Sequence, residues 1–312
     1  MKEMWIRCRL ITPMFSFGAY RESAELRTSE LKGAMRYTYR IACPSDTKTL
    51  AKEEAELFGF GAGNLDGHAS PIRLLIQGNK STEQECLLLH KNCKKLSCFL
   101  NGVIKVRVCL NQNLLKKDNK VHSRIDLEWY GDLIKLSLLL CGMGRRSRKG
   151  RGCFDVDDLT FENKEQIQKW LCGTLNKVAS AFSQEGLVEV YQMNGEEIVS
   201  AIQCSETRPV IQRILIGRRL DKWGIGGYLC SVDKACHALK KGDLKLQKKE
   251  ITGTAGKLAS PLLIRIVKAM DGYYPLYIFV KGVFREKIVD KDGFQRKKFI
   301  DKLEKDRKKE GR

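Results

Sequence analysis

The sequence predicts an α+β protein with two domains. The chain has 312 residues, and 43% of them are hydrophobic, which is enough to form the cores of two domains of about 150 residues each. Short segments of alternating polarity, typical of strands, are interleaved with longer segments of helical periodicity. We expect a first domain at residues 1–160, a second at residues 161–293, and a basic C-terminal helix or tail at residues 294–312.

The first strand and the first helix have the clearest signals. Met4–Ile11 alternates between polar and apolar residues and stops at a Thr-Pro pair, as a strand does at its end. Thr28 or Ser29 can cap the helix that follows, and Pro44 lies just beyond its expected end at Ala42. Apolar residues of this helix recur every three to four positions, so one face of it is expected to pack on a core.

The remaining elements complete a βαββαβ unit. Pro71–Ile76 and Val103–Leu110 are expected to form strands, Trp129–Cys141 a largely buried helix, and Cys153–Leu159 the closing strand. This order is that of the ferredoxin-like fold, which RNA-recognition (RRM) domains share. The first domain is therefore predicted to be ferredoxin-like.

The second domain is predicted to have the same fold. A helical stretch from Glu162 to about Ala181 is expected to connect the two domains. The later elements are expected to be strands at Val188–Tyr191 and Val210–Ile216, a short helix at Asp233–Lys240, strands at Pro261–Val267 and Leu276–Val280, and a terminal helix whose apolar side carries Phe299, Ile300 and Leu303.

The chain carries a large excess of positive charge. Its 57 Lys and Arg residues exceed its 37 acidic residues by 20, and residues 1–280 alone hold 44 basic and 30 acidic side chains. Such an excess repels itself and destabilises a compact state unless a polyanion offsets it. Nucleic acid is the commonest such partner, and an anionic membrane or an ordinary basic surface are the alternatives.

The cysteines and the apolar segments indicate the cellular compartment. Twelve cysteines are dispersed without a CxxC pair, and the N-terminus lacks the apolar core of a signal peptide. The longest apolar run, Leu133–Cys141, contains Lys135 and is too short to span a bilayer. We therefore expect a cytoplasmic protein with reduced cysteines and no membrane partner.

A basic, glycine-rich segment, GMGRRSRKGRG, is the strongest candidate binding site. Its glycines can adopt positive φ, and consecutive N–H groups there would form a concave site for an anion. Its guanidinium groups can bind phosphate oxygens in pairs. The segment lacks the GxxxxGK[ST] pattern of nucleotide-binding loops. RNA-backbone contacts are therefore predicted for Gly142, Gly144, Arg145, Arg146, Arg148, Lys149, Gly150, Arg151 and Gly152.

The first helix supplies a second cationic surface. Lys32, Arg36 and Arg40 recur at i, i+4 and i+8, opposite the apolar face, and Arg27 precedes them. Gly33 costs about 1 kcal/mol of helix propensity relative to alanine. A close approach of an RNA backbone would explain that glycine, so all five residues are predicted to bind RNA.

Two further groups raise the question of metal binding or catalysis. Cys86, His90, Cys93 and Cys98 are zinc-ligand residue types, but their spacing resembles no standard zinc finger, so no metal or other cofactor is predicted. His68 lies in a glycine-rich loop and could act as a general base in RNA cleavage. Because no further side chain completes a catalytic set around it, the protein is predicted not to be an enzyme.

Six segments together carry a family resemblance. They are LITPMFSFG at 10–18, ELRTSELKGAMRYTYR at 25–40, LFGFG at 57–61, SPIRLLI at 70–76, GMGRRSRKGRG at 142–152, and KLASPLLIRIV at 257–267 with the YYPLYIFV that follows it. Together they resemble RAMP-superfamily proteins of CRISPR effector complexes, most closely the first subunit of type III-B (Cmr) complexes. Arg151 departs from the family pattern, in which an aromatic or apolar residue is common at this place.

The resemblance implies a fold, a function and partners. It implies two ferredoxin-like domains of RAMP type and a non-catalytic subunit that binds CRISPR RNA near its 3′ end in defence against foreign RNA. The implied partners are the CRISPR RNA, a captured target RNA and other Cmr subunits, especially a neighbouring RAMP subunit. It also adds Lys257 and Ser260 to the predicted RNA-binding residues. The alternative is a RAMP endoribonuclease that processes CRISPR precursor RNA with His68 as its base.

Overall fold

The computed structural model describes most of the chain. The described residues are 2–19, 22–61, 67–78, 82–89, 95–115, 124–184, 186–202, 208–220, 224–241, 259–284, 287–289 and 293–310.

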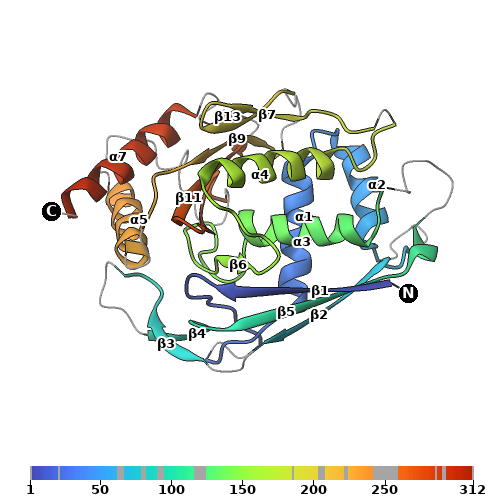
Figure 1. The fold of residues 1–312 in the computed structure, drawn as a ribbon, viewed down its shortest axis with the longest axis horizontal. Coiled ribbons are helices and arrows are strands. Elements are labelled where there is room, and N and C mark those ends of the chain that lie inside the picture. Colours follow the sequence, from blue (N-terminus) through green and yellow to red (C-terminus); the bar gives the residue numbers. More distant parts are fainter. Residues whose placement is uncertain are drawn as a thin grey trace.

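The first domain is built on a four-stranded antiparallel sheet with two helices against one face (Figure 1). Its elements are β1 (Lys2–Leu10), α1 (Thr28–Ala42), β2 (Ile72–Gly78), β5 (Val103–Leu110), α3 (Leu127–Leu140) and β6 (Phe154–Val156). The strand order is β2-β5-β1-β6, and every neighbouring pair is antiparallel. This is the strand order of a ferredoxin-like sheet, so the predicted fold of this domain is confirmed.

Short elements without a clear signal in the sequence are inserted in this domain. They are α2 (Thr47–Phe58), the hairpin of β3 (Glu83–Cys86) with β4 (Lys95–Cys98), and a 3₁₀ turn, η1 (Gln112–Leu114). The helix α2 has a clear N-cap, because the Asp46 carboxylate accepts hydrogen bonds from the N–H groups of Lys48 and Thr49, both at 3.0 Å. Its sequence, TKTLAKEEAELF, is mostly polar, which conceals its periodicity.

The second domain contains a five-stranded antiparallel sheet with the order β10-β11-β9-β8-β7. Its elements are β7 (Tyr191–Asn194), β8 (Glu197–Ser200), β9 (Ile211–Ile216), α5 (Gly224–Lys241), β10 (Leu262–Ala269), β11 (Gly272–Val280) and α7 (Phe294–Glu310), and β12 (Gly282–Phe284) pairs with β13 (Lys287–Val289) beside them. The strands β10-β11-β9-β8 lie in the order of a ferredoxin-like sheet. The order along the chain differs, because β8 takes the place of the last ferredoxin-like strand but comes first in the sequence. Three predicted bounds are wrong: the strand expected at Val188–Tyr191 begins at Tyr191, the helix expected at Asp233 begins at Gly224, and the strand expected at Leu276 begins at Gly272.

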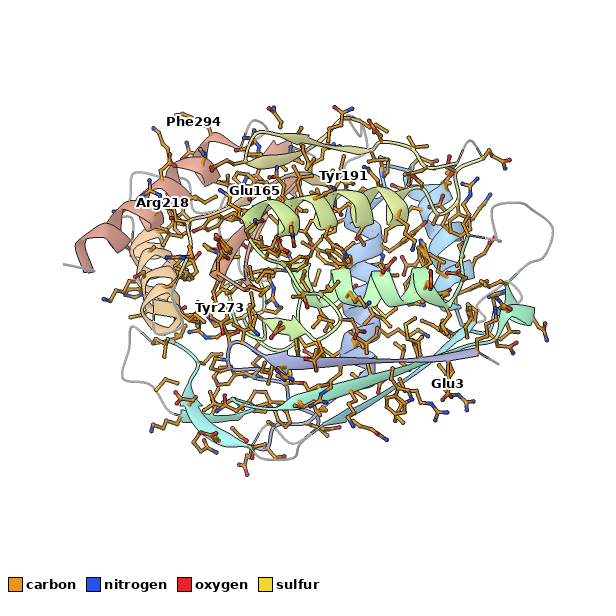
Figure 2. The ribbon with its side chains drawn as sticks, in the orientation of Figure 1. Glu3, Glu165, Tyr191, Arg218, Tyr273 and Phe294 are labelled. Atoms are coloured by element: carbon orange, nitrogen blue, oxygen red, sulfur yellow. The ribbon has the colours of Figure 1, made fainter. Side chains whose placement is uncertain are left out.

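The two sheets enclose a common layer of helices. The helices α1, α3 and α4 (Lys164–Ala179) lie between them, as Figure 1 shows, and one hydrophobic core contains Val106 of the first sheet, Leu139 of α3 and Ile278 of the second sheet. Tyr191, labelled in Figure 2, lies beside α4, and its hydroxyl donates to the Ala42 carbonyl at the end of α1 (2.8 Å). Because α4 contributes to this common core, the domain boundary at residue 160 stays a prediction.

A second core lies on the outer face of the second sheet. There α5 and α7 pack together, and the predicted apolar side of the terminal helix, Phe299, Ile300 and Leu303, is fully buried. The C-terminal segment is therefore part of the second core as far as its side chains are described. Among the described helices, none is both long and apolar enough to cross a membrane.

Candidate nucleic-acid interface

The glycine-rich segment 142–152 joins α3 to β6 and is folded tightly on itself. Gly142, Gly144, Gly150 and Gly152 all have positive φ, between 56° and 91°. A Cβ atom on Gly142 would lie 2.0 Å from a guanidinium nitrogen of Arg265, and one on Gly152 would lie 1.9 Å from the Met143 carbonyl oxygen. The glycines are therefore required by packing inside the protein itself.

A buried arginine of the second domain binds this loop to the end of α3. Arg265 of β10 is fully buried, and its guanidinium donates five hydrogen bonds to backbone carbonyls. The acceptors are Leu138 (3.3 Å) and Leu139 (3.1 Å) in the last turn of α3, and Ser147, Arg151 and Gly152 in the loop (each 2.7 Å). Carbonyls in the last turn of a helix lack intrahelical partners and carry the negative end of the helix dipole, so they favour a cation there.

Two of the predicted phosphate-binding arginines face the protein interior. Arg146 and Arg151 both pair with Asp233 of α5, which is fully buried, and the Arg151–Asp233 distance is 2.8 Å. The Leu89 N–H donates to the same carboxylate (3.0 Å). Burial lowers the pKa of Arg151, and the Asp233 charge opposes this shift. Only 1% of Arg151 is exposed, so its predicted phosphate contact does not fit; the residue that departs from the family pattern holds the loop to α5.

Two more predicted RNA-binding residues contact each other inside the protein. Lys149 is buried, and its ammonium donates to the Ser260 hydroxyl (2.8 Å) and to the Leu262 carbonyl (3.1 Å). Both contacts attach the loop to the start of β10. Lys257, also predicted to bind RNA, lies outside the described residues.

The predicted concave site of backbone N–H groups is occupied by the protein itself. The Gly144 N–H donates to the Glu30 carboxylate (2.6 Å), so a carboxylate takes the place expected for a phosphate. The Arg145 N–H donates to the Phe15 carbonyl (2.7 Å), and Gly152 is likewise bonded to a backbone carbonyl. These three N–H groups are therefore not available to a polyanion.

The two remaining cations of the loop lie on aromatic rings beside α1. The exposed guanidinium of Arg145 lies over the Phe17 ring at 5.0 Å from its centroid. That of Arg148 lies over the Tyr37 ring at 4.6 Å and donates to the Ser260 carbonyl (3.1 Å). Stacking on a ring restricts an arginine side chain before any ligand binds, so less conformational entropy is lost on binding.

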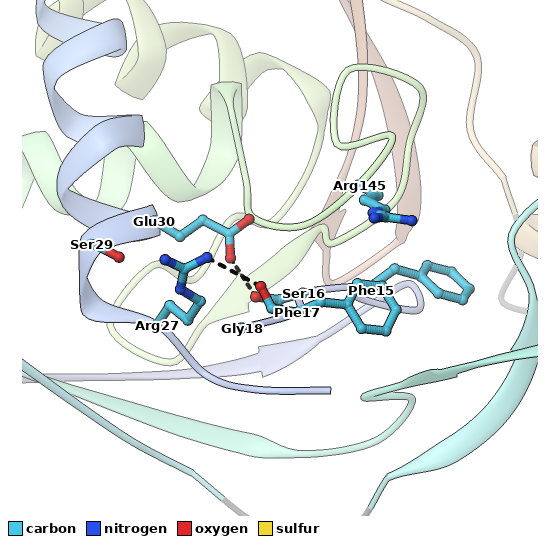
Figure 3. Close-up of a pocket in the computed structure, with 8 residues that line it drawn as sticks. All are labelled: Phe15, Ser16, Phe17, Gly18, Arg27, Ser29, Glu30 and Arg145. Carbon is cyan, nitrogen blue, oxygen red and sulfur yellow. Dashed lines mark hydrogen bonds between the residues drawn. The ribbon is translucent and has the colours of Figure 1, made fainter. Parts of the chain in front are cut away.

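A pocket lies at the N-terminal end of α1 (Figure 3). It has a volume of about 380 Å³, and Figure 3 shows Arg27 and Arg145 on its two sides with Phe17 between them. Arg27 donates to the Phe17 carbonyl (3.1 Å), and the Ser16 hydroxyl donates to Glu30 (2.5 Å). Two arginines from different elements thus converge on one hollow.

The exposed face of α1 lies between pockets on either side of the helix. Gly33 is exposed, and a Cβ atom added to it would meet no atom within 4 Å. No packing contact of the described residues explains this glycine, which leaves the helix backbone uncovered. We call the surface around Gly33, with the pockets on either side of the helix, the α1 groove. Its walls are formed by Arg27, Arg145 and Arg148 on one side and by Lys32, Arg36, His68 and Ser70 on the other.

The predicted ridge of three cations on α1 is partly neutralised. Arg36 and Arg40 both contact the Glu54 carboxylate of α2, with Arg40 Nη2 at 2.6 Å and Arg36 Nε at 3.6 Å. Lys32 donates to the Ser70 hydroxyl (2.9 Å), and burial, with a smaller contribution from Arg36, lowers its pKa. The predicted charge of the ridge is therefore reduced toward its C-terminal end, and the cations nearer the start of α1 are the better candidates.

The structure places His68 in this same groove. His68, Lys32, Arg36 and Ser70 line a hollow of about 410 Å³, and the buried Nδ1 of His68 has no hydrogen-bond partner among the described residues. The sequence does not show which side chains lie beside His68, because they come from different segments of the chain. This arrangement of a histidine beside two cations supports the alternative of a ribonuclease.

The predicted cysteine–histidine group is only partly described. Cys86 and Cys98 lie at different ends of the β3–β4 hairpin, whereas His90 and Cys93 fall outside the described residues. Within the described ranges, no three potential ligands come together to hold a metal ion, and all ten cysteines are free of disulfides.

Residues 7–155, which contain α1, α3 and the glycine-rich loop, match the model of the RAMP superfamily. No curated protein sequence matches the chain.

Solved structures extend the likeness over both domains. The chain is similar to the apo crystal structure of Cmr1 from Pyrococcus furiosus, with 15% identity, a TM-score of 0.57, and coverage of 96% of this chain and 97% of that one. It is also similar to a chain in a cryo-EM structure of the type III-B Cmr-beta complex bound to cognate target RNA, with 11% identity, a TM-score of 0.55, and coverage of 96% and 98%. A second Cmr-beta structure, with target RNA, AMPPnP and single-stranded DNA, gives the same values. The predicted α+β fold of RAMP type is therefore confirmed.

Proposed function

We propose that this chain is a non-catalytic, RNA-binding subunit of a type III-B CRISPR (Cmr) effector complex. In this proposal the α1 groove holds the backbone of the CRISPR RNA near its 3′ end. The observation that carries the proposal is the position of Arg145 and Arg148, which lie on aromatic rings beside a helix surface that Gly33 leaves open.

The chemistry of the groove favours phosphate over base edges. Its exposed polar groups are mainly guanidinium groups, which bind phosphate oxygens in pairs, and contacts of this kind position RNA without reading its sequence. The net charge of +20 supports a polyanionic ligand. A guide RNA with a variable sequence requires a site of this type.

The partners and the location are part of the same proposal. The similar Cmr-beta chains come from structures described as bound to cognate target RNA. We extend this to the present chain: a target RNA pairs near it, other Cmr subunits and in particular a neighbouring RAMP subunit contact it, and the complex acts in the cytoplasm against foreign RNA.

The double change Arg145→Ala with Arg148→Ala tests the groove. Each phosphate neutralised on a single strand contributes about 0.7 to the slope of log affinity against log salt, so loss of two should reduce the slope by about 1.4. At about 0.1 M salt the affinity should fall about tenfold to thirtyfold. Fluorescence anisotropy with labelled single-stranded RNAs of unrelated sequence measures both quantities.

Lys48→Ala with Lys169→Ala is the matched control, because it removes the same charge from exposed positions on α2 and α4. An unchanged salt slope in the arginine variant, or a loss confined to one RNA sequence, would contradict backbone binding. RNA recovered from the same reactions, without added metal, also tests the alternative: specific cleavage that disappears in His68→Ala would replace the non-catalytic proposal with a ribonuclease.

Gly33→Gln separates folding from binding. A glutamine there should raise the free energy of unfolding by about 0.5 kcal/mol, because helix propensity improves and nothing obstructs the side chain. It should lower RNA affinity by about tenfold, or about 1.4 kcal/mol, because it holds the strand away from the helix. Gly173→Gln is the control, since Gly173 is an exposed glycine of α4 that also has open space around it. Equal RNA affinity in the two variants would exclude a close approach at Gly33.

A further inference from the structure

The outer face of the first sheet is open and carries an exposed tryptophan. On this sheet α1 and α3 pack against one face, and Glu3, labelled in Figure 2, lies on the other. The strand register places Leu75 of β2, Arg107 of β5 and Trp5 of β1 in one row across that outer face. Trp5 is 44% exposed and Leu75 is 42% exposed, so two exposed apolar side chains lie on either side of Arg107.

Cations lie in the same row as the two apolar side chains and in the rows beside it. The next row of the register contains Gln77, Lys105 and Arg7, and the rows beyond carry Arg73 and Arg9. With Arg107 there are five cations, against the acidic side chains Glu3, Asp155 and Asp157. Arg73 and Lys105 are exposed and have no ion-pair partner among the described residues. The face therefore combines two exposed apolar side chains with an excess of positive charge.

Three of the five cations on this face are paired with carboxylates. Glu3 binds Arg107, whose guanidinium lies over the Trp5 ring at 5.7 Å. Arg7 and Arg9 both contact Asp157, at 3.2 and 3.4 Å. Exposed pairs of this kind contribute only about 0–1 kcal/mol each, so a phosphate that replaces the carboxylate loses little stability. Each cation thus remains available to an anionic ligand.

The position of Trp5 matters because β1 and β5 are the two central strands of the sheet. Ferredoxin-like sheets that bind single-stranded RNA stack bases on aromatic side chains of these strands and bind phosphates with nearby cations. A surface for a protein partner is typically depleted of charge at its centre, whereas here Arg107 lies directly between the two apolar side chains. The charge therefore favours a polyanion with an apolar, planar group.

We propose that the outer face of the first sheet is a second site for single-stranded RNA, separate from the α1 groove. In it a base stacks on Trp5, and Lys105, Arg73 and Arg7 bind the adjoining phosphates. This inference shares with the proposed function only the premise that the chain handles RNA. The unpaired strand that binds here lies on the opposite side of the sheet from α1.

The test uses the full chain carrying Arg145→Ala and Arg148→Ala, so that the α1 groove is weakened in every sample. Trp5→Ala in this background should reduce affinity for a ten-nucleotide adenine-rich RNA by about fivefold to a hundredfold, which is the range for losing one stacked base. Trp5→Phe should restore most of the affinity. A strand of the same length with abasic sugars should bind equally to the background protein and to its Trp5→Ala variant, because it has phosphates but nothing to stack.

Intrinsic fluorescence supplies a second readout. RNA should quench part of the tryptophan emission, and Trp5→Phe should abolish this part. Trp129 is buried and Trp170 is partly buried, and Trp223→Phe is the control for the fourth tryptophan, which lies outside the described residues. Unchanged affinity in Trp5→Ala together with unchanged quenching in Trp5→Phe would overturn the proposal. So would equal losses of complex assembly in Trp5→Ala and Leu75→Ala with RNA affinity intact, since these would assign the face to a protein partner. Loss of function in the α1 groove leaves this base-dependent signal in place, so the two proposals fail independently.

Discussion

Replacing Asp233 with alanine should lower the free energy of unfolding by about 3–5 kcal/mol, the typical cost of removing one partner from a buried ion pair. Asp233 is fully buried and pairs with both Arg146 and Arg151. Its removal leaves the Arg151 charge without a partner in a place that water does not reach. Chemical denaturation monitored by circular dichroism measures the change.

Asp157→Ala is a matched control for this prediction. Asp157 also contacts two arginines, Arg7 and Arg9, but both of those side chains are about half exposed. Its loss should cost at most about 1 kcal/mol. Similar losses in the two variants would show that burial of the Asp233 cluster does not determine its contribution.

Arg265→Met should be the second strongly destabilising change, again by about 3–5 kcal/mol, because methionine fills much of the volume but leaves five buried carbonyls without their donor. Each unsatisfied group of this kind is costly. Because three of these carbonyls belong to the glycine-rich loop, RNA binding by Arg145 and Arg148 should weaken as well. Denaturation and RNA anisotropy on the same preparation measure the two effects.

Arg265→Lys tests whether the geometry of the guanidinium or only its charge is needed. An ammonium group has at most three donors and cannot reach both α3 and the loop as the planar guanidinium does. The lysine variant should therefore lie between the wild type and Arg265→Met in stability. A lysine variant as stable as the wild type would show that charge alone is sufficient.

The order of elements in the first domain could be predicted because its strands and helices carry local signals. Val103–Leu110 has the predicted bounds, and α1 ends at Ala42, as the following proline indicates. The predicted cap is wrong, because the N-cap residue is Arg27 and no side chain caps the helix. The second domain is harder to predict. Its strands β7 and β8 have the sequences YQMN and EIVS, which carry little apolar alternation, so the permuted order of its strands is not evident from the sequence.

The binding segment could be located from sequence, but the direction of its side chains could not. Five cations between glycines identify residues 142–152 as special. Which of them are exposed depends on Asp233 and Ser260, which are far away in the chain and have no local signal for this contact. The neutralisation of Arg40 similarly depends on Glu54 of the unpredicted α2. Arg265 does carry a visible signal, because it is a single charged residue in the apolar segment PLLIRIV.

The layer of helices between the two sheets has a consequence for biosynthesis. A ribosome releases the first sheet and its helices long before β11, the strand that contributes Ile278 to the same core, has been made. Until then the side of α1 and α3 that faces the second sheet has no partner, and exposed apolar surface on nascent domains favours aggregation. We therefore expect the N-terminal half to need protection by chaperones during translation, because its core is completed only when nearly all of the chain has been synthesised.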